Sequence, residues 1–209
     1  DKNETLTVSE DASSAGSVEI LNADDPDTND KHTIKTFMGV AVPAAGLTLS
    51  STSTPAIAGG TLTVSQSGTV TFDPEGDFDE LLLKDSKLTF DYEVTDNAAT
   101  SSHTDKSTLT INISAVNDAI EDGDESFSTT ENRQITNSNS ANVLSNATDI
   151  DTGDTKHVSV DGTALTGSES ESYDGDKGGS FTLTADGAMT FDPGTDFDKL
   201  QAGATTDTS

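Results

Sequence analysis

One block of sequence occurs twice in this chain, almost letter for letter. Residues 68–81 read Gly-Thr-Val-Thr-Phe-Asp-Pro-Glu-Gly-Asp-Phe-Asp-Glu-Leu, and residues 187–200 read Gly-Ala-Met-Thr-Phe-Asp-Pro-Gly-Thr-Asp-Phe-Asp-Lys-Leu. The spacing between Gly68 and Gly187 is too long for one solenoid unit and about right for a whole domain. The chain is therefore expected to contain two tandem copies of one domain, an arrangement that spans distance or repeats a site more often than it catalyses a reaction.

Composition and charge narrow the classes of partner. There are 38 acidic residues against 10 basic ones, a formal net charge of -28, so nucleic acid and anionic membrane surfaces would be repelled. No apolar run approaches the ~20 residues of a membrane span, so we expect no direct membrane insertion. Cysteine is absent, which excludes disulfides and thiolate metal sites. Small secreted domains without disulfides often use a bound metal for stability.

Apolar and polar residues alternate over short stretches, as expected for half-buried strands. The clearest stretches in copy one include Leu62/Val64, Val70/Phe72, the run from Leu88 to Val94, and Leu109 to Ile113. Seven or more short strands separated by turn signals predict an all-β fold, with each copy an Ig-like, antiparallel β-sandwich. Further strands are expected at Leu6/Val8, Val18/Ile20, His32 to Val40, Ser126 to Thr129, Val143–Leu144, His157 to Val160, Phe181/Leu183 and Met189/Phe191.

The boundary between the copies is expected near Val116-Asn-Asp-Ala119, which predicts domains at 1–117 and 118–209. After the repeated block, copy one continues from Leu81 to Val116, whereas copy two runs only from Leu200 to Ser209. The second copy therefore lacks counterparts of the two best strands of copy one. A sandwich without them exposes a sheet edge and part of its core. We expect copy two to be less stable, or to be completed by another chain.

Two acidic loops occupy equivalent points of the two copies. Residues 24–30 read Asp-Asp-Pro-Asp-Thr-Asn-Asp, and residues 149–154 read Asp-Ile-Asp-Thr-Gly-Asp. In an Asp-x-Asp turn the first and third side chains project to one side, which brings together the hard oxygen donors that Ca²⁺ requires. Neither loop is an EF-hand, because Thr36 and Val160 stand where the bidentate Glu would be. Solvated acidic loops are common in so acidic a chain, so spacing alone leaves calcium binding and a plain acidic surface both open.

Three motifs in combination point to a known family. They are the repeated Gly-x-x-x-Phe-x-Pro-x-x-Asp-Phe-x-x-Leu block, residues 88–96 (Leu-Thr-Phe-Asp-Tyr-Glu-Val-Thr-Asp) and residues 108–118 (Thr-Leu-Thr-Ile-Asn-Ile-Ser-Ala-Val-Asn-Asp). Together they resemble VCBS-type, cadherin-like repeats of large bacterial RTX-type surface adhesins, which are exported by type I secretion. The resemblance covers all of copy one and most of copy two. It implies tandem cadherin-like sandwiches at the bacterial cell surface, with a role in adhesion or biofilm attachment.

The resemblance also implies Ca²⁺ at the domain junctions. Cadherin-like junctions use an acidic residue after the first strand, an Asn-Asp linker and an Asp-x-Asp loop. Asp96 is a further candidate at a strand end, and Glu131 with Asp25 and Asp27 matches the same roles for junctions outside this segment. The linker is shorter than in animal cadherins, which favours one or two ions over three. The candidate calcium ligands are Glu10, Asp25, Asp27, Asp30, Asp96, Asn117, Asp118, Glu131, Asp149, Asp151 and Asp154.

The expected function is a calcium-stiffened extender repeat whose partners are neighbouring repeats of the same chain, with self-association or a surface ligand as further partners. A carbohydrate- or peptide-binding module is the alternative, and Tyr173 is the one aromatic residue expected in a loop that could contact such a ligand. An enzyme is not expected. The acids Asp77 and Asp79 could suggest a glycosidase pair, but both recur in copy two as Asp196 and Asp198, and turn-forming Asp residues are ordinary.

Overall fold

The computed structural model describes residues 1–26, 30–82, 84–96, 103–136, 142–167 and 170–209. Within these residues the chain is all-β and contains no helix. No helix long and apolar enough to span a membrane is therefore found among them. The contacts divide the chain into two compact units. The first unit contains Asp1–Asp118 and Ile150–Thr152, and the second contains Ala119–Asp149 and Gly153–Ser209.

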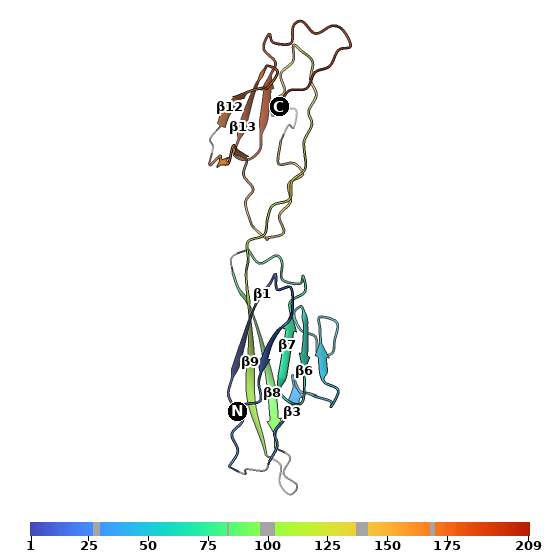
Figure 1. Cartoon of the computed structure of the whole chain (residues 1–209), viewed down its shortest axis with the longest axis vertical. Helices are drawn as coiled ribbons and strands as arrows, with labels where there is room; N and C mark the ends of the chain where they lie inside the picture. Colours follow the sequence, from blue (N-terminus) through green and yellow to red (C-terminus); the bar gives the residue numbers. More distant parts are fainter. Residues whose placement is uncertain (27–29, 83, 97–102, 137–141, 168–169) are drawn as a thin grey trace. The chain divides into compact units, whose positions relative to one another are not determined.

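The first unit is a sandwich of two sheets (Figure 1). One sheet has the strand order β1-β9-β8-β3-β4, and the other has the order β2-β7-β6-β5. The strands are β1 (Glu4–Ser9), β2 (Gly16–Glu19), β3 (Thr33–Phe37), β4 (Val40–Ala41), β5 (Leu47–Leu49), β6 (Thr61–Val64), β7 (Thr69–Asp73), β8 (Ser86–Thr95) and β9 (Thr104–Ser114).

The core of the first unit is built from the alternation seen in the sequence. Successive side chains of a strand point to opposite faces, so every second residue enters the space between the sheets. On β9, Leu109, Ile111 and Ile113 are each 0% exposed, while the intervening Thr110 and Asn112 are half-buried. Phe37 lies 5.6 Å from Phe90, centroid to centroid, within this core. The prediction of an all-β sandwich is confirmed.

Two details of the first unit differ from what the sequence predicted. The stretch from His32 to Val40 is not one strand but two, β3 and β4, which are joined at Met38 and Gly39, both with positive φ. β1 pairs with β9 in parallel, with Val8 opposite Ile113. Such a pairing joins strands about a hundred residues apart, so local alternation could not have indicated its direction.

The second unit contains two separate sheets, of strand order β10-β11 and β12-β13-β14 (Figure 1). The strands are β10 (Ser159–Val160), β11 (Thr163–Ala164), β12 (Ser170–Asp174), β13 (Ser180–Thr184) and β14 (Met189–Asp192). The strands predicted at Phe181/Leu183 and Met189/Phe191 are confirmed. The strand predicted from His157 to Val160 shrinks to Ser159–Val160.

Two other predictions for the second unit were wrong. The stretch from Ser126 to Thr129 forms no strand and is exposed, and Val143–Leu144 forms a turn. In copy one the residues that match Ser126 to Thr129 lie in β1, which pairs with β9. The described residues of the second unit supply no counterpart of β9, so this stretch has no neighbour to pair with, and alternation alone does not make a strand.

Candidate functional site

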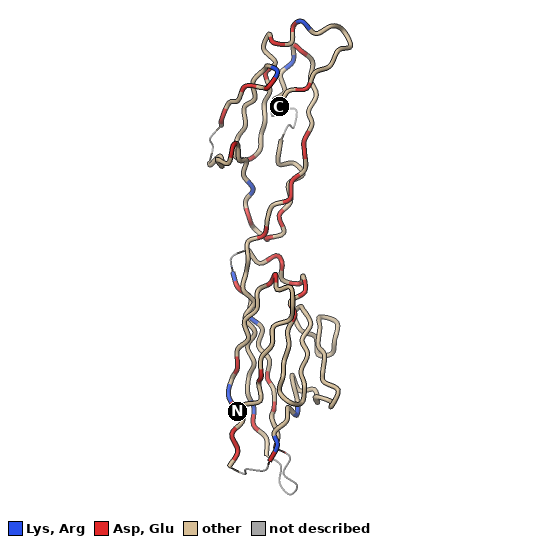
Figure 2. Tube along the Cα trace, viewed as in Figure 1, with Lys and Arg blue, Asp and Glu red and all other residues tan. Residues whose placement is uncertain are grey.

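Acidic side chains lie along both units and basic ones are few (Figure 2). Most of the acids are exposed, and exposed acids are unremarkable in a chain of this composition. The informative acids are the buried ones, because burying a charge is costly unless a partner compensates it. Three carboxylates in the described residues are buried: Glu10, Asp96 and Asp151, at 2%, 8% and 3% exposure.

Glu10 follows the end of β1 and is held there by the backbone. Its N–H donates to the carbonyl of Ser114 at 3.1 Å, which extends the pairing of β1 with β9 by one residue. The side chain turns inward, and its Oε1 accepts a hydrogen bond from the N–H of Val116 at 2.5 Å. Among the described residues, the other oxygen, Oε2, is buried with no hydrogen-bond partner. A buried carboxylate oxygen without a donor is a ready ligand for a cation.

The surroundings of Glu10 disfavour its charge. Burial raises the pKa of the Glu10 carboxyl above its ordinary 4.5, and interactions with the backbone of Val116 and of Leu81 lower it by smaller amounts. The carboxylates of Asp11 and Asp151 also raise the pKa by repulsion. No cation is among the groups that shift this pKa, and a bound cation would offset both the burial and the repulsion.

Asp151 lies in the short segment Ile150–Thr152, which belongs to the first unit. The N–H of Thr152 donates to the carbonyl of Glu80 at 3.2 Å, and its hydroxyl donates to the Glu80 carboxylate at 3.1 Å. Oδ2 of Asp151 accepts a hydrogen bond from the N–H of Asp118 at 2.7 Å. Asp151 is thus bonded within the first unit, and its charge is among those that raise the pKa of Glu10.

Within one six-residue loop, Asp149, Asp151 and Asp154 can each place a carboxylate oxygen within 4.8 Å of the other two. Gly153, within this loop, has a φ of 97°, a conformation that costs glycine little. Two ligands of one Ca²⁺ are separated by at most about twice the metal–oxygen distance of ~2.4 Å. The three oxygens therefore meet the spacing that one ion requires.

A second group of three carboxylates lies in the first unit and consists of Asp25, Asp30 and Asp96, again within 4.8 Å. Sequence reasoning placed Asp25 and Asp30 in one loop and Asp96 at the end of β8, and the fold brings them together. Two histidines flank the group: His32 directly follows the acidic loop in the sequence, whereas the place of His103 was not foreseen. Nε2 of His32 lies 3.5 Å from Asp25, and Nδ1 of His103 lies 3.4 Å from Asp96. No local signal marks His103, because the contact depends on how the chain turns back from β8 to β9.

Among the described acids, Glu10, Asp118 and Glu131 belong to neither group. Asn117 is exposed, and its amide donates to the carbonyl of Asp118 at 2.9 Å. Glu131 is half-buried in a turn and accepts a hydrogen bond from Asn132 at 3.3 Å. Asp27 lies outside the described residues. Glu10 and Asp118 contribute through the contacts with Val116 and Asp151 described above.

The acids of the repeated block have a structural role that recurs in both copies. Asp77 accepts a hydrogen bond from the N–H of Gly60 at 2.8 Å, and Asp196 accepts one from Gly179, also at 2.8 Å. These carboxylates tie the repeated block to a glycine turn that must approach it closely.

Tyr173 was expected in a loop, and this prediction was wrong. It lies in β12, where it is half-buried opposite Phe181. It is therefore part of a sheet and is a poorer platform for a ligand than a loop aromatic would be. No protein-family model matches the chain, and no curated protein matches it.

Proposed function

We propose that this chain is a calcium-stiffened extender repeat of a large, secreted bacterial surface adhesin of the VCBS-type, cadherin-like kind. The observation that carries the proposal is Glu10, a carboxylate buried to 2% exposure whose Oε2 has no hydrogen-bond partner among the described residues. Its nearest electrostatic neighbours include two further acids, Asp11 and Asp151. Such an arrangement is unfavourable for the apo protein and favourable for one that binds a cation.

The donor set fits calcium better than a softer metal. Ca²⁺ takes 6–8 oxygen ligands, and carboxylates and backbone carbonyls are its usual ligands in proteins. Asp149, Asp151 and Asp154 would hold one ion, and the charge of Asp151 also acts on Glu10. Asp25, Asp30 and Asp96 would hold another. The chain has no cysteine to offer a thiolate.

Calcium would supply a substantial part of the stability of such a domain. Extracellular modules bind Ca²⁺ with dissociation constants of roughly 0.1–1 mM. At a free concentration a hundred times the dissociation constant, one site adds about 2.7 kcal/mol to the free energy of unfolding. A typical domain has only about 5–15 kcal/mol in total. Ions that neutralise neighbouring acidic loops would therefore stabilise each repeat, fix it to its neighbours in the chain, and make the array stiff.

An extender role is favoured over a carbohydrate-binding module because the chain offers few exposed aromatic rings. It has eight Phe, two Tyr and no Trp, and among the described large hydrophobics Phe127 is the one exposed aromatic. Tyr92 is 2% exposed, and Tyr173 is half-buried in β12. Catalysis is not proposed, because Asp77 bonds to Gly60 and the pattern recurs in copy two.

Calcium titration of the purified chain tests the proposal. We expect isothermal titration calorimetry to detect binding, and thermal unfolding to shift upward by several degrees from EGTA to millimolar Ca²⁺. Asp151→Asn should weaken both effects. Asp198→Asn is the matched control, since Asp198 is an exposed acid outside both carboxylate groups, and it should leave them unchanged. Identical melting curves in EGTA and in calcium would refute the proposal, and a specific hit on a glycan array would favour the binding-module alternative.

A further inference from the structure

β1 and β9 are the first and the last strand of the first unit, and they lie side by side in parallel (Figure 1). Their pairing runs without interruption from Glu4 opposite Leu109 to Ser9 opposite Ser114. Among the described strands of the two sheets of this unit, every other neighbouring pair is antiparallel. The chain therefore enters the sandwich at the start of one strand and leaves it at the opposite end of the neighbouring strand.

Hydrogen bonds continue this pairing beyond both ends of β1. Before β1, the N–H of Thr108 donates to Oδ1 of Asn3 at 3.0 Å, so that the Asn3 side chain adds one position to the register. After β1, the N–H of Val116 donates to Oε1 of Glu10 at 2.5 Å. The two paired segments, residues 3–10 and residues 108–116, are called the β1–β9 clamp below.

The inner face of the clamp is closed to water. Leu6 and Val8 of β1 are each 7% exposed, and the residues opposite them, Ile111 and Ile113 of β9, are each 0% exposed. A backbone group that loses its partner where water is excluded carries the full cost of desolvation. Sliding β1 along β9 would therefore break hydrogen bonds that water cannot replace at once on this side.

Tension along the chain would load the clamp in shear. It would draw the start of β1 and the end of β9 in opposite directions, both along the strands, so the evenly spaced bonds of the parallel pair would be strained together. In an antiparallel pair the same two chain ends would leave at one end of the strands, and the bonds would break one after another. Forced unfolding is governed by the unfolding rate, and a step that must break several bonds at once has a higher barrier.

We propose that the β1–β9 clamp sets the force at which the first unit unfolds, and that this unit resists tension applied through the segments that precede β1 and follow β9. This mechanical role goes beyond the calcium-dependent stiffening proposed above. It does not depend on calcium, because the bonds and the packing that carry it are made by the protein alone.

Pulling the full chain in two directions tests the proposal. The natural chain has no cysteine, so introduced thiols can attach the DNA handles of an optical trap. Lys2→Cys with Asn117→Cys places the handles at opposite ends of the clamp and loads it in shear. Ser13→Cys with Asn117→Cys places both handles at the same end and opens the clamp bond by bond. All three positions are exposed, and the residues after Asn117 lie outside the loaded segment in both variants.

In EGTA we expect the shear direction to require an unfolding force roughly twofold or more above that of the other direction, at the same loading rate. Two valine truncations provide a matched comparison within the shear variant. Val8 lies in the clamp, and Val64 lies in β6 of the opposite sheet, at 7% and 1% exposure. Val8→Ala and Val64→Ala should each lower the stability measured in denaturant, but Val8→Ala alone should clearly lower the unfolding force.

Equal unfolding forces in the two directions would overturn the proposal. So would a Val64→Ala variant whose unfolding force in shear falls as far as that of Val8→Ala, because the barrier would then lie outside the clamp. Since the measurement is made in EGTA, neither result bears on calcium binding. A chain that does not respond to calcium would, in turn, leave the clamp unaffected.

Discussion

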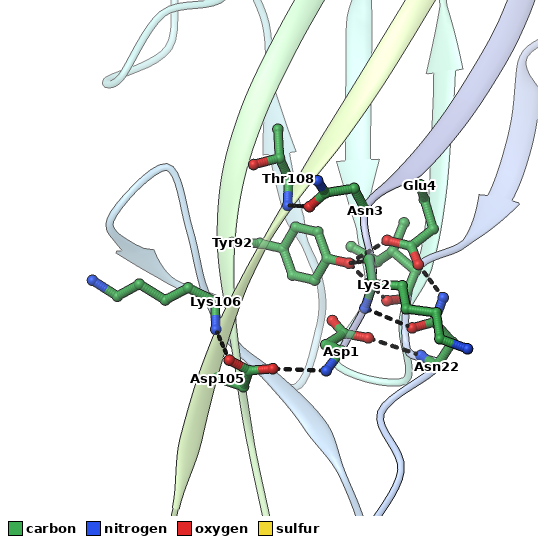
Figure 3. Close-up of polar contacts among 10 residues, drawn as sticks. Asp1, Lys2, Asn3, Glu4, Asn22, Tyr92, Asp105, Lys106 and Thr108 are labelled. Atoms are coloured by element: carbon green, nitrogen blue, oxygen red, sulfur yellow. Dashed lines mark hydrogen bonds and ion pairs between the residues drawn. The ribbon is translucent and has the colours of Figure 1, made fainter.

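The hydroxyl of Tyr92, on β8, donates a hydrogen bond to the backbone carbonyl of Ile20, which follows β2 in the opposite sheet, at 3.0 Å. The same hydroxyl lies 3.1 Å from the carbonyl of Lys2 and also contacts the carboxylate of Glu4, which Asn22 contacts in turn (Figure 3). One side chain thus joins the two sheets and the start of β1.

Tyr92→Phe should lower the free energy of unfolding of the first unit by about 1–2 kcal/mol, because it removes the donor and leaves the buried carbonyl of Ile20 without it. Urea unfolding at neutral pH measures the loss. Ser17→Ala, at an exposed position on β2, is a suitable control and should change the stability little. A Tyr92→Phe variant as stable as the natural chain would show that the bond contributes nothing.

The contribution of Tyr92 should also depend on pH. Burial, and then the hydrogen bond with Glu4, raise the pKa of Tyr92 above its ordinary 10.0. Stability from the neutral hydroxyl is therefore fully present below pH 10 and is lost as the pH rises through the raised value of the folded state. The difference in unfolding free energy between the natural chain and Tyr92→Phe should narrow steadily above pH 10. A constant difference from pH 8 to 11 would contradict this assignment.

Glu10→Gln should reverse its effect on stability when calcium is added. The pKa of Glu10 is raised above 4.5, so the folded state favours the neutral carboxyl. The free energy of unfolding therefore falls as the pH rises through the raised pKa and the carboxyl becomes charged. In EGTA at pH 7 the variant should be more stable, by about 1 kcal/mol, since Gln keeps an acceptor for Val116 without the charge. This gain should fade towards pH 4.

In about 10 mM calcium the order should invert, because a site with a dissociation constant of about 0.1 mM adds about 2.7 kcal/mol to the natural chain and less to the variant. Thermal unfolding in the two buffers measures both halves of the prediction. Glu19→Gln, at an exposed position of β2, is the matched control and should behave like the natural chain in each buffer. A variant that is less stable than the natural chain in both buffers would indicate a purely structural role for Glu10.

Gly60→Ala should be far more damaging than Gly39→Ala, although both glycines have positive φ, 70° and 78°. A Cβ at Gly60 would lie 2.4 Å from the carbonyl oxygen of Asp73 and 2.9 Å from the ring of Phe72, whereas nothing lies within 4 Å of a Cβ at Gly39. We expect a loss of about 1 kcal/mol at Gly39 from backbone strain alone, and at least about 3 kcal/mol at Gly60. Chemical denaturation compares the two, and equal losses would contradict the explanation.

Val8→Ala and Phe127→Ala should differ in the same direction as their exposure. Val8 is buried against β9, so its truncation should cost the first unit about 2 kcal/mol. Truncation of the larger but exposed Phe127 should change the stability of the second unit by less than about 0.5 kcal/mol. Denaturant unfolding of the two variants measures both changes in stability. A large loss at Phe127 would mean that the residue packs in this chain more tightly than its exposure indicates.

The sequence by itself determined the all-β class, the strands with strong alternation and the acidic loops. Leu109, Ile111 and Ile113 point to one face because side chains alternate along a strand, which is a local property. Only the tertiary structure decided that β1 pairs in parallel with β9, that Glu10 is buried, and that Asp96 joins Asp25 and Asp30. It also decided that residues 126–129 form no strand, although their pattern matches β1. Strand pairing and burial depend on neighbours distant in the chain, and no local pattern records whether such a neighbour is present.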